Sequence, residues 1–117
     1  MKLITAAVLK TLLKNAAATI ANPERDTMQD KTVKFFNPCG AASWFFSEAE
    51  EIPAADNYNG QDDLRLFGWC DLGMGPGCAE LGYVMLSELQ GIRLMGGLGI
   101  ERDTWHEGTL GEAVNSG

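Results

Sequence analysis

Two short aromatic segments separated by a turn signal constrain the fold of this chain most. Residues 32–37 alternate, with Val33 and Phe35 on one face and Lys34 and Phe36 on the other. This period of two predicts a β-strand. An Asn-Pro pair and a glycine then predict a turn, and residues 42–47 predict a second strand through their three aromatic side chains, Trp44, Phe45 and Phe46. We therefore expect an aromatic hairpin that supplies much of the core.

The N-terminal segment is predicted to form the one long helix. Residues 5–21 begin with a possible N-cap, Thr5, and end just before Asn22-Pro23, where a helix is disfavoured. Lysines interrupt the apolar stretch too early for an export signal or a membrane span, so we interpret the segment as an amphipathic helix packed on a sheet. Its apolar face follows the i, i+3, i+4, i+7 rule through Leu9, Leu12, Leu13, Ala16, Ala17 and Ile20.

Later segments predict short strands separated by glycine-rich breaks. Residues 64–72 and 80–86 are rich in β-forming side chains, and Gly68 indicates a close approach between backbones. One helical turn is expected at residues 87–90. A last strand is predicted at residues 100–107, and residues 108–117 are expected to be a flexible tail. These segments predict a single α+β domain over residues 1–117, with the N-terminal helix on a small, mainly antiparallel sheet.

Charge is unevenly distributed along the 117 residues. The net charge is −7, but residues 1–34 carry six basic and three acidic groups, whereas residues 35–117 carry three basic and thirteen acidic groups. A surface this acidic repels phosphate backbones, so we expect no direct nucleic-acid binding and instead a protein partner with a basic surface. Solubility alone is the simpler explanation for the same acids.

An acidic loop is predicted at residues 48–63. This stretch has six acids, no basic residue, and a proline and a glycine among its sixteen residues. Loops of that length are uncommon in compact domains unless they have a function. The candidate partner-binding residues are these acids, together with two from the predicted last strand: Glu48, Glu50, Glu51, Asp56, Asp62, Asp63, Glu101 and Asp103.

Enzymatic alternatives have weaker sequence support. Three cysteines without paired spacing favour a reducing, cytoplasmic location and give no zinc motif. A Cys–His pair with His106 has no local motif in its favour, and the glycines at 73, 75 and 77 lack the following helix of a phosphate loop. We predict no catalytic residue, metal or cofactor. The open alternative is a metal-dependent hydrolase or nuclease that uses the Glu101 to Glu107 strand face. Its candidate ligands are Glu101, Asp103, His106 and Glu107, joined by Glu80 or Asp71.

Several short blocks resemble a family of small bacterial proteins that carry a domain of unknown function and occur on plasmids, integrative elements and phages. The helix is richer in alanine and longer than the family pattern. The matching blocks cover residues 1–107 and are Met1-Lys2-Leu3-Ile4-Thr5, Val33-Lys34-Phe35-Phe36, Trp44, Leu66-Phe67-Gly68, Cys70-Asp71-Leu72-Gly73, Glu80-Leu81-Gly82-Tyr83, Leu86-Ser87-Glu88-Leu89 and Leu98-Gly99-Ile100-Glu101-Arg102-Asp103.

The resemblance implies a genomic context and supplies no catalytic residues. Small acidic proteins of mobile elements often disarm host defences by occupying a nucleic-acid groove, so the resemblance together with the charge suggests a non-enzymatic, anti-CRISPR-like inhibitor that mimics nucleic acid. A second expectation is an accessory protein of element transfer that binds another element protein. No membrane contact is expected, and the sequence leaves the oligomeric state open.

Overall fold

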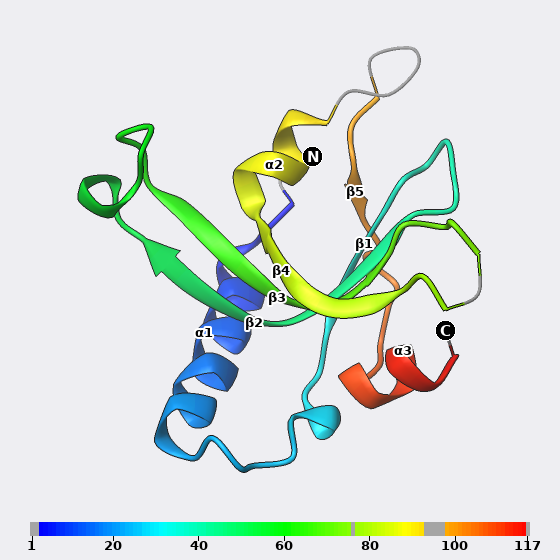
Figure 1. Cartoon of the computed structure of the whole chain (residues 1–117), viewed down its shortest axis with the longest axis horizontal. Coiled ribbons are helices and arrows are strands. Elements are labelled where there is room, and N and C mark those ends of the chain that lie inside the picture. The colour runs from blue at the N-terminus through cyan, green and yellow to red at the C-terminus, as the bar shows by residue number, and fades with distance from the viewer. Residues whose placement is uncertain (1–2, 76, 93–97, 117) are drawn as a thin grey trace.

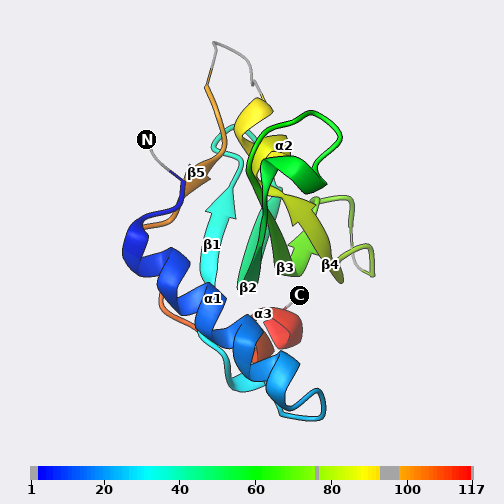
Figure 2. The same cartoon turned by 90° about the vertical axis from the view of Figure 1, so that its left-hand side faces the viewer.

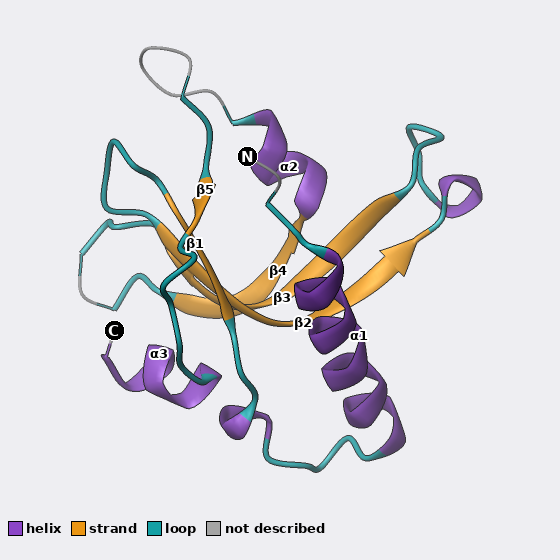
Figure 3. Ribbon diagram, turned by 180° about the vertical axis from the view of Figure 1, so that it is seen from behind, coloured by secondary structure: helices purple, strands orange, loops and turns teal. Residues whose placement is uncertain are grey.

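Helix α1 (Ala6–Ala21) forms as its apolar periodicity predicts. In this computed structural model, which describes residues 3–75, 77–92 and 98–116, the Thr5 hydroxyl accepts a hydrogen bond of 3.2 Å from the Val8 amide and so caps the first turn. The helix lies across the sheet (Figures 2 and 3). No helix among the described residues is long and apolar enough to cross a membrane.

Five antiparallel strands form one strongly twisted sheet in the order β4-β3-β2-β1-β5 (Figure 1). The predicted hairpin is confirmed, because Phe35 of β1 pairs with Trp44 of β2. The α+β class and the single globule are also confirmed. The strands are β1 (Val33–Phe36), β2 (Ser43–Ile52), β3 (Asp63–Asp71), β4 (Glu80–Met85) and β5 (Glu101–Arg102).

The core lies between α1, the sheet and the short helix α2 (Leu86–Gly91). The rings of Phe35 and Phe46 meet edge to face at 5.7 Å, and both side chains are fully buried. Leu12 of α1 is 1% exposed, so the middle of the helix is anchored in this cluster. Burial of such side chains supplies the main stabilising free energy.

Gly68 permits the close contact between β2 and β3 that the sequence predicts. A Cβ atom at this position would lie 1.9 Å from the Phe45 carbonyl oxygen, which is far inside van der Waals contact. Beyond Gly68 the β2–β3 register shifts between Phe46 and Glu48. The extra residue is a β-bulge, which increases the local twist of the sheet.

The prediction of an acidic loop over residues 48–63 is wrong in extent. Strand β2 continues to Ile52, and β3 already begins at Asp63. Ala49 is buried opposite Leu66, so the glutamates around it belong to the second half of a strand, where Ala49 is the only buried side chain. Residues 53–62 form the connection, which contains the short 3₁₀ helix η2 (Ala54–Asp56).

The C-terminal predictions need two corrections. Strand β5 ends at Arg102 because the Asp103 carboxylate accepts the Trp105 amide at 3.0 Å, a local turn that ends strand pairing. The expected flexible tail instead contains α3 (Leu110–Ser116), with Leu110 fully buried. Thr109 and Glu112 form a reciprocal capping box at its start. Helix α3 lies beside the 3₁₀ helix η1 (Thr27–Gln29).

Candidate functional site

A groove between the second half of α1 and strands β2 to β4 brings together three of the predicted partner-binding acids. Its volume is about 440 Å³, within the usual range for binding sites. We call it the acidic groove. Its lining consists of helical apolar side chains (Leu13, Ala16, Ala17 and Ile20), Thr19, side chains of the neighbouring strands (Ala49, Arg65, Phe67 and Tyr83) and three carboxylates (Glu48, Glu50 and Glu51).

Ile20 and Tyr83 give the acidic groove its accessible apolar surface. Ile20 is 82% exposed and Tyr83 is 67% exposed. The expectation that Ile20 packs in the core is therefore wrong, because the last turn of α1 extends past the strands (Figure 3). The Tyr83 ring packs on Phe67 at 5.0 Å between centroids. Large exposed apolar side chains next to a groove are typical of interaction sites.

A polar network fixes Glu48 at one end of the acidic groove. The Thr19 hydroxyl donates to the Glu48 carboxylate at 2.9 Å, and Arg25 donates to the Thr19 oxygen at 3.0 Å. Arg25 also forms a bidentate ion pair with the buried Asp30, at 2.5 and 2.9 Å. Paired in this way, Asp30 is accommodated in the interior, and the end of α1 is tied to η1 and β2.

Glu50 and Glu51 contribute differently to the groove. Glu50 forms an ion pair with Arg65 across β2 and β3, and the Arg65 guanidinium lies 5.4 Å from the centre of the Tyr83 ring. Glu51 has no side-chain hydrogen bond or ion pair with the rest of the described chain. The groove lining therefore holds three carboxylates and one guanidinium, and Glu51 is the carboxylate most available to a partner.

The acids at the β2–β3 connection stabilise local structure. The Asp62 carboxylate accepts the Ala54 amide at 2.7 Å. Asp63 accepts the Ser87 amide at 3.1 Å and also the Ser87 hydroxyl, so it holds the first turn of α2. Asp56 is exposed at the tip of the hairpin. Asp62 and Asp63 therefore have structural roles in addition to any role in binding.

Glu101 and Asp103 lie away from the acidic groove, and the strand face proposed for a metal does not form. The Asp103 carboxylate is 3.9 Å from the Lys34 ammonium, and Trp105 and Glu107 follow the turn after β5. Among the described residues, no three His, Cys, Asp or Glu side chains are placed to hold a metal ion.

The Cys70 thiol is poorly suited to act as a nucleophile. Burial, aided by the nearby Glu80 charge, raises the pKa of this thiol to about 11, so it carries little thiolate at neutral pH.

Sequence reasoning found the glutamates of the acidic groove but missed its apolar part. The sequence pattern predicts Ile20, Phe67 and Tyr83 only as residues of a helix or a strand. A usable signal is the position of Ile20 in the last turn before Asn22-Pro23, where a helix commonly extends past the sheet that it covers. The groove joins residues of α1, β3 and β4, and this arrangement depends on strand order, which the local pattern does not contain.

Comparison with known proteins identifies one family. A family model described as a protein of unknown function (DUF2958) matches residues 3–112. No curated protein and no solved structure matches the chain.

Proposed function

We propose that this chain, which belongs to the DUF2958 family of proteins of unknown function, is a non-enzymatic binding protein that holds a basic segment of a partner protein in the acidic groove. One observation carries the proposal: accessible apolar side chains and three carboxylates line the same groove. A segment that presents Lys or Arg beside an apolar side chain complements both features.

We further propose that the partner is a host complex that uses nucleic acid to direct defence, and that binding inhibits it in the cytoplasm. The support is the resemblance to proteins of plasmids, integrative elements and phages, together with the net charge of −7. Such complexes hold nucleic acid in basic channels. A carboxylate-lined groove that engages a basic channel wall competes with nucleic acid for the same cations, as an anti-CRISPR-like mimic would.

The test is protection of a targeted plasmid in cells that carry a CRISPR or restriction system. We expect the parent chain to raise transformation by at least about tenfold, and Glu51→Lys and Ile20→Gln each to remove most of that gain. Both side chains are exposed, so folding should be preserved. Asp56→Lys is the matched control, because it reverses an exposed acid outside the groove and should protect like the parent.

Three outcomes would overturn the proposal. Protection that survives Glu51→Lys and Ile20→Gln but fails in Asp56→Lys would place the binding surface at the hairpin tip. A parent chain that gives no protection, but loses stability with a chelator and contains stoichiometric metal on elemental analysis, would favour the hydrolase. Binding only to a transfer protein of the element would favour the accessory function.

A further inference from the structure

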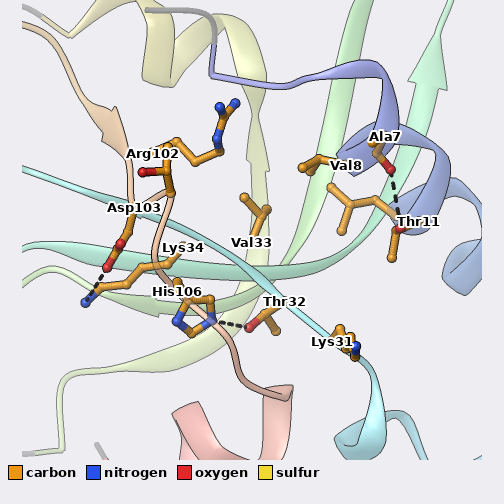
Figure 4. A pocket seen from close by; sticks show the side chains of 12 residues that line it. Ala7, Val8, Thr11, Lys31, Thr32, Val33, Lys34, Arg102, Asp103 and His106 are labelled. Carbon is orange, nitrogen blue, oxygen red and sulfur yellow. Dashed lines mark hydrogen bonds and ion pairs between the residues drawn. The ribbon is translucent and has the colours of Figure 1, made fainter.

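A second hollow lies against the first half of α1, and its charge is opposite to that of the acidic groove. Its volume is about 310 Å³, near the lower end of the range for small-molecule sites. Figure 4 shows side chains from α1, β1 and the segment after β5 around it. We call it the basic pocket. Its charged lining residues are Lys31, Lys34, Arg102 and Asp103.

The excess of cations in the basic pocket is unusual for this chain. Three of its nine basic residues line this one hollow, together with a single carboxylate. The chain as a whole has sixteen acidic residues, so a randomly chosen part of the surface would have a negative net charge. A concave surface with one sign of charge concentrates counter-ions of the other sign.

Two of these cations have contacts that fix their positions. The Arg102 guanidinium donates to the Leu3 carbonyl at 3.0 Å, which orients this side chain. The Lys34 ammonium is 3.9 Å from the Asp103 carboxylate, and both side chains are 30% exposed. The Lys34 ammonium also lies 5.5 Å from the centre of the Phe45 ring, so a bound anion would share Lys34 with these two contacts.

The remaining lining supplies a polar side and an apolar side. The Thr32 hydroxyl is hydrogen-bonded to His106 Nε2 at 2.9 Å (Figure 4). Val8 and Leu12 of α1, with Val33 of β1, contribute the apolar wall. Apolar walls with a few converging polar groups are typical of pockets for small organic molecules.

We propose that the basic pocket binds a small organic anion, a molecule with an apolar body and one phosphate or carboxylate group. The body would contact Val8 and Val33, and the anionic group would face the basic side chains of the pocket lining. This site shares no lining residue with the acidic groove. A result that contradicts one proposal therefore does not contradict the other.

The test is amide NMR titration of the full chain with four probes: phenyl phosphate, benzoate, phenol and inorganic phosphate. We expect phenyl phosphate or benzoate to shift the amides of Thr32, Val33 and His106, and to bind at least about tenfold more tightly than phenol or inorganic phosphate. The tighter of the two organic anions identifies the preferred anionic group. Equal binding of phenol, or no shift with either organic anion, would overturn the proposal.

Charge variants complete the test. Lys31→Glu combined with Lys34→Gln should weaken binding of the organic anion by at least about tenfold. Lys14→Glu is the matched control, because Lys14 is an exposed lysine of α1 outside the pocket lining, and it should change affinity by less than about twofold. If the pocket and control variants lose affinity equally, the probe senses only net charge and the pocket is not a site.

Discussion

The two halves of α1 border hollows of opposite character. Residues of the first half line the basic pocket with Lys31, Lys34 and Arg102, whereas residues of the second half line the acidic groove with Glu48, Glu50 and Glu51. The net charge of −7 describes neither region. The charge of each hollow therefore depends on which strands border it. The basic residues lie in or next to β1 and β5, and the acidic residues lie in β2.

Substitution of Leu12 should have the largest effect, because this side chain anchors the helix that borders both hollows. Leu12→Asp removes a side chain that is 1% exposed and buries an unpaired charge, so we expect unfolding to become easier by about 4 kcal/mol or more. Thermal and denaturant unfolding measure this change. Thr11→Asp, at the neighbouring exposed position, should cost less than about 1 kcal/mol, and similar losses in both variants would remove α1 from the core.

Alanine substitutions of two paired glycines, Gly68 and Gly82, should differ next most in their effect on stability. Gly68→Ala would place a methyl group 1.9 Å from the Phe45 carbonyl oxygen, and we expect a loss of about 3 kcal/mol in the free energy of unfolding. Gly82, its partner on β4, has open space where a Cβ atom would be added, so Gly82→Ala should be nearly neutral. Equal effects would mean that β2 and β3 do not approach closely at Gly68, which would contradict the position of the neighbouring Phe67 in the acidic groove.

The network at the far end of α1 can be broken by one isosteric change. Asp30→Asn removes the negative charge and one of the two acceptors that Arg25 uses in a mostly buried pair, and we expect a loss of about 2 kcal/mol in the free energy of unfolding. Chemical denaturation of the variant and of Glu24→Gln, an exposed neighbour, provides the comparison. An unchanged midpoint for Asp30→Asn would show that the network does not fix the groove.

The smallest expected effect concerns the histidine of the basic pocket. Burial lowers the pKa of His106 below its ordinary 6.5, and Lys34 acts in the same direction, whereas Asp103 and Glu112 oppose the shift. The unfolded chain therefore binds a proton more readily than the folded chain, and this part of the stability is complete above pH 6.5 and is lost as the pH falls through the lower, folded pKa.

Melting curves between about pH 7.5 and about pH 5.5 measure the histidine effect. The His106→Gln variant, which keeps a polar group near Thr32, should lose less stability on acidification than the parent. An NMR titration of the imidazole gives its pKa directly. A folded pKa above the ordinary value would contradict the burial of this ring.

The fold was largely predictable from periodicity, whereas the sites were only partly so. The alternation at β1 and the 3.6-residue pattern of α1 are local signals that survive in the structure. The segment from Glu48 to Ile52 is predicted as a loop, although it is part of β2. Its buried face carries only Ala49, so it lacks the usual β-branched signal of a strand. Helix α3 was missed although Thr109 and Glu112 have capping-box spacing, a signal outweighed by the few apolar residues near it.

Neither hollow was predictable as a unit, because each joins residues far apart in sequence. His106 and Thr32 are separated by 74 positions, and Ile20 and Tyr83 come from opposite halves of the chain. Such meetings follow from the strand order β4-β3-β2-β1-β5, which places β5 next to β1. Local patterns predict strands but do not specify their neighbours.

One measurement tests the opposition between the two hollows most directly: amide NMR titration with two probes that share a phenyl body and differ in charge, phenyl phosphate and benzylamine. Phenyl phosphate should shift Thr32, Val33 and His106 in the basic pocket, and benzylamine should shift Ala16, Ala49 and Phe67 in the acidic groove. Separate sets of shifted amides would support the account. Both probes shifting one common set would contradict it.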